Sequence, residues 1–192
     1  MKTYQNIESF EKKVDYFPTA QEESEVKELF LSKNFKAPSS YIDFIKSYGA
    51  ISIMSDVYAV GVSEIPRITI ENNYTPIGRF LKWDDSHNSI SEILKMYDDQ
   101  FPANFIPFIE GCLGDYIGFL INKNGTYTIN YWFHEELLLQ ITHLVSNDFM
   151  SFIESIIEHF IDYDKGVIKD ITHTPSPKMI ELLKKTGKWK GE

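Results

Sequence analysis

The sequence has few of the features that would place it in an oxidising compartment or a membrane. It has one cysteine, Cys112, among 192 residues, so it cannot form an internal disulfide and offers no thiol cluster for zinc. No apolar run approaches the ~20 residues that a membrane-spanning helix needs. The first residues also lack the apolar centre of a secretory signal. We therefore expect a cytoplasmic protein that does not bind a membrane.

Sequence motifs of common enzyme classes are missing too. There is no GxxxxGK[ST] or GxGxxG phosphate-binding loop, no GxSxG nucleophile elbow and no HExxH zinc motif. Two short polar clusters remain, His134 with Glu135 and Glu136, and Asp84 with Asp85 and His87. Neighbouring strand residues point to opposite faces, which argues against a metal in the first cluster, and loops collect residues like the second for turns and caps. We expect no enzymatic activity, no metal and no cofactor.

Positive charge is scarce over most of the chain. Residues 1–164 contain 12 basic and 25 acidic residues, a net charge of −13, whereas residues 165–192 contain seven basic and three acidic residues, a net charge of +4. An acidic domain repels the phosphate backbone of nucleic acid and attracts a basic protein. Direct binding of nucleic acid is therefore not expected. The charge is explained either by a basic protein partner or by solubility alone.

The composition is sufficient for one packed domain, because 43% of the residues are hydrophobic and 15% are aromatic. We expect this domain to span residues 1–163. Residues 164–192 are then a polar connector and a short basic C-terminal helix. That helix is either a partner-binding arm or an element that packs on its own domain, and the sequence favours the second.

The middle of the chain has the strongest β pattern. Residues 106–109 and 116–121 are apolar runs separated by a Gly-rich break. Residues 122–125, Asn-Lys-Asn-Gly, are typical of a tight turn because Asn and Gly tolerate positive φ. Residues 126–133 then alternate in the manner of a strand. The pattern predicts a three-stranded antiparallel meander.

Helical patterns flank this meander. The predicted helices are residues 5–15, a helix starting at the capping box Thr19–Glu22, a helix from Pro38 to Gly49, a helix starting at the capping box Ser89–Glu92 and ending near Asp98-Asp99, and residues 149–161. Short strands are predicted within residues 51–62, 65–70 and 79–81. The sequence thus predicts an α+β fold with a mainly antiparallel sheet and helices packed around it.

Four segments have the order and spacing of a known family. They are residues 37–50 (APSSYIDFIKSYGA), residues 106–119 (IPFIEGCLGDYIGF), residues 131–135 (YWFHE) and residues 147–153 (NDFMSFI). Over about residues 20–161 these segments resemble the SMI1/KNR4 (SUKH) superfamily. The chain departs from the family pattern at Asn34–Ala37, at Ala50 in place of a second glycine, and at Gly111-Cys112-Leu113.

The resemblance implies an α+β domain that is not an enzyme. Bacterial members of the superfamily are typically immunity proteins that bind and neutralise a polymorphic toxin, often a nuclease, as in toxin–antitoxin and contact-dependent inhibition systems. Fungal members act in cell-wall signalling. Our leading hypothesis is an immunity protein that binds a cognate basic nuclease domain. The alternatives are a regulatory or scaffold module and, less favoured, a small hydrolase using His134 with Glu135 or Cys112.

Exposed acids near loops and sheet edges are the expected contacts with the partner, with two tryptophans as aromatic anchors. The predicted contact residues are Trp83, Asp84, Asp85, Asp98, Asp99, Glu110, Asp115, Trp132, Glu135 and Glu136. For each acid the alternative is a solvated surface residue, and for each tryptophan a core residue.

Overall fold

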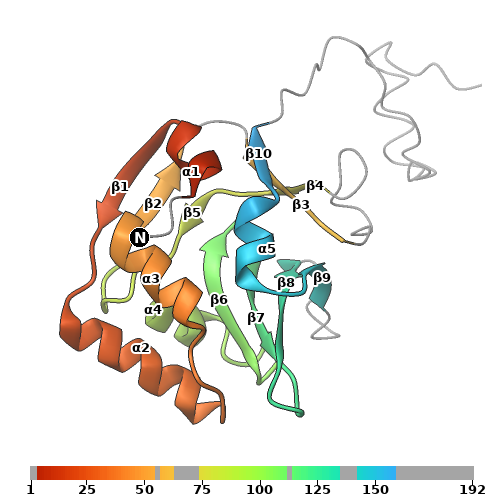
Figure 1. Ribbon diagram of the computed structural model, residues 1–192. Coiled ribbons are helices and arrows are strands. Elements are labelled where there is room, and N and C mark those ends of the chain that lie inside the picture. The colour runs from red at the N-terminus through yellow and green to blue at the C-terminus, as the bar shows by residue number, and fades with distance from the viewer. Residues whose placement is uncertain (1–3, 55–56, 63–73, 112–113, 135–141, 159–192) are drawn as a thin grey trace, which may run out of the picture. The chain divides into compact units, whose positions relative to one another are not determined.

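The fold was obtained as a computed structural model (Figure 1). It describes residues 4–54, 57–62, 74–111, 114–134 and 142–158. The chain divides into two compact units, Met1–His159 and Phe160–Glu192, and the described residues all belong to the first. The strand predicted at residues 65–70 and the predicted C-terminal connector and helix lie outside the described residues.

Two antiparallel sheets organise the described part of the chain. The larger has seven strands in the order β1-β2-β5-β6-β7-β8-β9, and the smaller has three in the order β10-β3-β4. The strands are β1 (Lys12–Tyr16), β2 (Ala50–Ile53), β3 (Val57–Val60), β4 (Tyr74–Pro76), β5 (Arg79–Phe80), β6 (Phe105–Glu110), β7 (Tyr116–Ile121), β8 (Tyr127–Trp132), β9 (Thr142–Ser146) and β10 (Ile156–Glu158). The helices are α1 (Gln5–Ser9), α2 (Ala20–Ser32), α3 (Ser39–Tyr48), α4 (Ile90–Met96) and α5 (Phe149–Glu154). The predicted α+β fold with a mainly antiparallel sheet is confirmed.

The predicted meander forms the centre of the larger sheet. Strands β6, β7 and β8 pair in sequence, and the turn between β7 and β8 closes where Asn122 N donates to Thr126 O at 2.8 Å. Strand β9 extends the meander beside β8. The sequence analysis predicted neither β9 nor β4.

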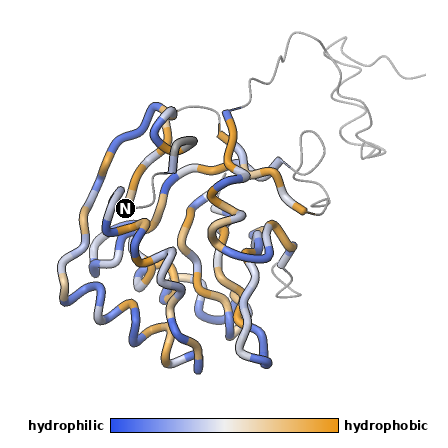
Figure 2. The backbone as a smooth tube through the Cα atoms, in the orientation of Figure 1, coloured by the Kyte–Doolittle hydropathy of each residue, from blue (hydrophilic) through white to orange (hydrophobic). Residues whose placement is uncertain are grey.

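Both faces of the central strands are buried. On one face, Tyr41 of α3 and Phe149 of α5 pack against Phe108, with ring centroids 5.6 and 5.7 Å apart. On the other face, Phe101, which follows α4, packs against Trp132 of β8, with ring centroids 4.6 Å apart. Figure 2 shows β6 and β7 hydrophobic along most of their length, while α2 is mostly hydrophilic. This two-sided burial explains why β6 and β7 are apolar at successive positions rather than alternating.

Local signals determine the ends of α2 and α3 as predicted. The capping box at α2 is complete, because the Thr19 hydroxyl accepts from Glu22 N at 3.3 Å and the Glu22 carboxylate accepts from Thr19 N at 2.6 Å. Helix α3 ends at Gly49, whose φ of 75° favours glycine and whose N–H donates to Ile45 O at 2.7 Å.

Two helix predictions are wrong in extent. The helix predicted for residues 5–15 stops at Ser9, and Lys12–Tyr16 forms edge strand β1. The helix predicted for residues 149–161 stops at Glu154, and Ile156–Glu158 pairs with β3 as β10. In both places β-branched residues at helical spacing meet a neighbouring strand, and ladder pairing with that strand outweighs the weak helical preference. Residues 160 and 161 lie outside the described residues.

Candidate partner-binding site

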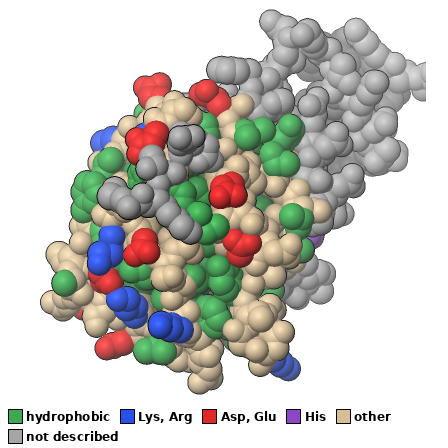
Figure 3. Space-filling model, viewed as in Figure 1, with side chains coloured by type: hydrophobic (Ala, Val, Ile, Leu, Met, Phe, Trp, Pro, Cys, Tyr) green, Lys and Arg blue, Asp and Glu red, His purple; other side chains and the backbone are tan. Residues whose placement is uncertain are grey.

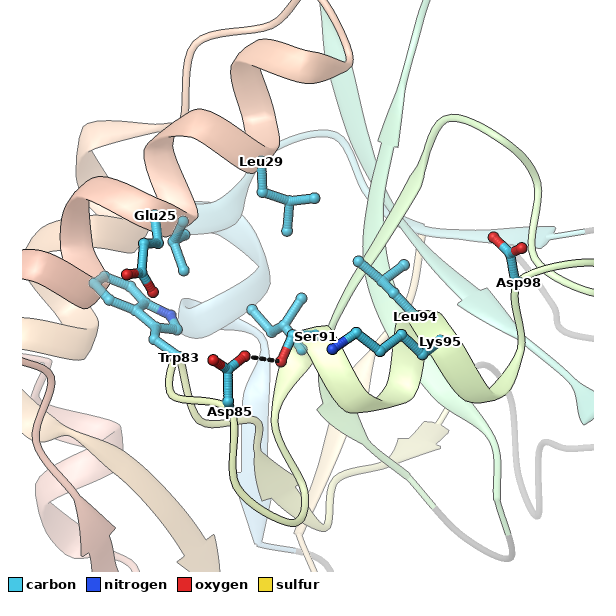
Figure 4. A pocket seen from close by; sticks show the side chains of 10 residues that line it. Glu25, Leu29, Trp83, Asp85, Ser91, Leu94, Lys95 and Asp98 are labelled. Carbon is cyan, nitrogen blue, oxygen red and sulfur yellow. Dashed lines mark hydrogen bonds between the residues drawn. The ribbon is translucent and has the colours of Figure 1, made fainter.

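A groove of about 490 Å³ lies between α2 and α4 (Figure 4). It is lined by Glu25, Val26, Leu29, Trp83, Asp85, Ile90, Ser91, Leu94, Lys95 and Asp98, and we call it the α2–α4 groove. Its volume falls within the ~300–1,000 Å³ range of typical ligand pockets.

Helical spacing produces the apolar floor of this groove. Val26 and Leu29 are three residues apart on α2, and Ile90 and Leu94 are four apart on α4, so each pair shares one helix face. Val26 and Ile90 are buried in the core, whereas Leu29 and Leu94 are only half-buried. The packing of the two helices therefore leaves two leucines partly uncovered in the groove.

Trp83 supports the floor from beneath. Its side chain is 4% exposed, and its Nε1–H donates to the Tyr41 hydroxyl at 2.9 Å. Burial raises the pKa of Tyr41 well above its usual value, so this hydroxyl stays protonated at all physiological pH values. The bond fixes the loop that leads from β5 into α4.

Acids surround the apolar floor. Glu25, Asp85 and Asp98 are exposed, and the Asp85 carboxylate accepts from the Ser91 hydroxyl at 3.1 Å (Figure 4). Lys95 is the basic side chain in the lining. Residues 20–32 contain four acidic and one basic residue (net −3), and residues 83–99 contain five acidic and one basic (net −4). The two segments that flank the groove thus carry −7 of the −13 charge of residues 1–164.

Other acids are dispersed over the surface, and part of the negative charge of α2 is offset by ion pairs. On the face shown in Figure 3, Asp and Glu side chains lie scattered among basic and apolar ones. Glu23, also on α2, forms ion pairs with Lys27 and with Lys46 at 2.9 Å, and the hydrogen bonds from these lysines lower its pKa. The groove therefore combines an apolar floor with acids from both of its flanking segments.

Only some of the predicted contact residues lie at the groove. Trp83, Asp85 and Asp98 line it, and exposed Asp99 follows Asp98. Asp84 is half-buried, and its carboxylate accepts from Ser86 N at 3.2 Å and from Ser86 Oγ at 2.8 Å, which stabilises the loop. Glu135 and Glu136 lie outside the described residues.

Glu110 lies away from the groove, on the larger sheet, where its carboxylate pairs with Arg79 Nε at 2.7 Å. It belongs to a row of directly paired residues that crosses all seven strands: Lys13, Ser52, Arg79, Glu110, Tyr116, Trp132 and Thr142. A hollow beside this row is lined by Lys13, Asp15, Ser52, Met54, Arg79, Phe80, Lys82 and Asn88. Its lining is mostly polar and contains more basic than acidic side chains, unlike that of the groove.

A surface position is wrong for three predicted contact residues. Trp83 is 4%, Asp115 3% and Trp132 0% exposed. Trp132 packs against Tyr97 and Phe101 in the core, at ring-centroid distances of 5.3 and 4.6 Å. The apolar surface of each tryptophan is satisfied inside the domain, so neither is an exposed anchor.

Asp115 instead holds two strands together. Its carboxylate accepts from the Tyr131 hydroxyl and from His134 N at 3.0 Å, and it pairs with His134 Nδ1. Gly114 has a φ of 94°, which turns the chain into this position. We call these four residues the Asp115 clasp. It joins the start of β7 to the end of β8, so the Gly-Asp and Trp-Phe-His segments of the sequence are structural here.

This arrangement does not support the hydrolase alternative. The Asp115 clasp uses His134 Nδ1, and the other proposed participants, Cys112 and Glu135, lie outside the described residues. Within the described ranges, no group of three or more His, Cys, Asp or Glu side chains is placed to hold a metal ion.

None of the helices described is long and apolar enough to cross a membrane.

The sequence analysis missed Glu25, Leu29, Leu94 and Lys95. The first two were available in principle, because the capping box at Thr19 fixes the phase of α2 and puts them on one side of the helix. No local pattern shows that α2 lies beside α4, because that contact joins distant parts of the chain.

Comparison with known proteins supports the resemblance. A sequence model of the SMI1 / KNR4 family (SUKH-1) matches residues 18–155, which is more than half of the chain. The SPbeta prophage-derived uncharacterized protein YokK of Bacillus subtilis (strain 168) is 27% identical over 179 residues, covering 85% of this chain and 89% of that protein. By the extent of the family match, the chain belongs to the SMI1/KNR4 (SUKH-1) family.

Proposed function

We propose that this protein is an immunity protein that binds a cognate toxin in a one-to-one complex and blocks it. Membership in the SMI1/KNR4 family supports an immunity-type or protein-binding role, and members are generally not enzymes. The observation that carries the proposal is the α2–α4 groove, where an apolar floor is bordered by acids and the two flanking segments together carry a net charge of −7.

The chemistry of this surface favours a basic nuclease as the toxin. A nuclease needs a positive surface to hold phosphates, and carboxylates presented by a rigid domain can occupy that surface in place of nucleic acid. The apolar floor would supply the buried centre of the interface, and the acids its polar rim. Inhibition of this kind requires binding alone, with no bond made or broken.

The experiment is a pull-down at low salt followed by mass spectrometry, and co-expression with each basic toxin recovered. We expect cells to die when the toxin is expressed alone and to survive when this protein is added. An inactivated toxin should co-purify with it at equal stoichiometry.

Recovery of unrelated, non-toxic partners, together with failure to protect against any basic toxin, would contradict the proposal. That outcome would favour the alternative of a regulatory or scaffold module that binds host proteins through the same groove.

A further inference from the structure

We infer that the α2–α4 groove is the docking site for an amphipathic, basic helix of the partner protein. Apolar side chains of this helix enter between Leu29 and Leu94. Its lysines or arginines lie against Glu25, Asp85 and Asp98. The inference rests on the proposed function and deepens it, because it names the surface and the kind of segment that the surface accepts.

The shape of the groove points to a helix. Its two walls are the helices α2 and α4, and a third helix laid between two others is a recurrent mode of peptide recognition, with anchors spaced three or four residues apart. A volume of about 490 Å³ accommodates one or two large apolar side chains of the partner. Leu29 and Leu94 are half-buried in the free protein and would become fully buried beneath such anchors.

The charge of the groove selects a basic helix. Three of the lining side chains are acidic and one, Lys95, is basic. The Ser91 hydroxyl holds the Asp85 carboxylate at 3.1 Å, so this charge is positioned before binding. Such preorganisation lowers the entropy lost on binding and favours a defined contact over diffuse attraction.

Two exposed apolar residues on the same helices provide matched controls. Leu31 on α2 is 59% exposed and Met96 on α4 is 53% exposed, and neither lines the groove. Glu154, an exposed acid on α5, serves as the control for charge. Changes at these positions alter hydrophobicity or charge by similar amounts without touching the groove.

The test uses two synthetic peptides of about 18 residues, long enough to form a helix on binding. One has leucines at helical spacing among lysines, and in the other every leucine is serine. Binding to the full-length protein is measured by isothermal titration calorimetry. We expect the Leu–Lys peptide to bind about tenfold more tightly than the Ser–Lys peptide. Leu29→Ser and Asp85→Lys should each weaken the affinity for the Leu–Lys peptide about tenfold. Leu31→Ser and Glu154→Lys should change this affinity less than about twofold.

A gain-of-affinity variant guards against loss of folding. Lys95→Glu changes an exposed side chain and should tighten the Leu–Lys peptide about two- to fivefold. Equal binding of the two peptides, absence of binding, or equal losses with Glu154→Lys and Asp85→Lys would each overturn the inference. The peptide assay contains no toxin. If the protein protected cells but did not bind the peptides, the docking site would be refuted and the proposed function would remain.

Discussion

At the scale of single residues, the buried carboxylate of Asp115 is important because it accepts hydrogen bonds from more than one residue. Asp115 is 3% exposed and accepts hydrogen bonds from Tyr131, itself fully buried, and from His134. Hydrogen bonds to a charged acceptor are stronger than neutral ones, and a buried donor left without an acceptor is costly. The side chain therefore contributes to stability through the groups that it satisfies.

We predict that Asp115→Ala lowers the free energy of unfolding by about 2–4 kcal/mol, because it leaves the Tyr131 hydroxyl buried without its acceptor. Urea denaturation followed by circular dichroism measures the loss. Asp85→Ala, at an exposed position, should change stability by less than about 0.5 kcal/mol. Equal stability of the Asp115→Ala variant and the wild type would show that the Asp115 clasp does not contribute to stability.

At the scale of elements, α2 depends on its capping box. Thr19→Ala removes the side-chain acceptor for Glu22 N and should cost about 1 kcal/mol of stability. Thermal unfolding measures this loss. Thr19→Ser, which keeps the hydroxyl, is the matched control, and an equal loss in both variants would argue against the cap.

The same helix makes stability depend on pH. Hydrogen bonds from the Thr19 hydroxyl and then from Thr19 N hold the pKa of Glu22 below its ordinary value of 4.5. Because the folded pKa is the lower one, this stabilisation is fully present above about pH 5 and is lost as the pH falls through the folded pKa.

We therefore predict that Glu22→Gln loses less stability than the wild type between about pH 6 and pH 3.5, because the amide keeps an acceptor but does not titrate. Urea unfolding at both pH values measures the difference. Glu28→Gln, at an exposed position on the same helix, should follow the wild type. If Glu22→Gln also followed the wild type, the carboxylate of the cap would not be a source of acid sensitivity.

Elements with a local signal could be predicted from the sequence, and elements defined by distant pairing could not. The capping box at Thr19, the helix end at Gly49 and the turn at residues 122–125 depend on nearby residues, and the structure has each of them. The capping box predicted at Ser89–Glu92 is only half formed: Ser89 caps α4 by accepting from Glu92 N, but the Glu92 carboxylate accepts from Asn88 N instead of Ser89 N. Strand β10 forms because β3 offers Ala59 as the partner of Ile156, although the local spacing is helical. The α2–α4 groove could not be predicted for the same reason. Its acids are visible in the sequence, but α2 and α4 come together only in the fold.

At the scale of the whole molecule, the net charge of −9 acts at longer range than any single contact. Exposed charges interact over roughly 10 Å at 0.1 M salt. Acids scattered over the surface, as in Figure 3, therefore contribute to attraction during approach, and acids beside the groove contribute after contact. Charge and apolar floor should consequently affect different rate constants.

We predict that association with the cognate toxin slows about tenfold or more when salt rises from about 50 to 500 mM, while the dissociation rate changes little, because screening acts mainly on the encounter. Surface plasmon resonance measures both rates. Leu29→Ser should do the opposite, raising the dissociation rate at nearly constant association rate, since it removes apolar contact without removing charge. Association that is insensitive to salt would refute electrostatic capture even for a toxin that the protein neutralises, and the groove floor would then have to account for the affinity alone.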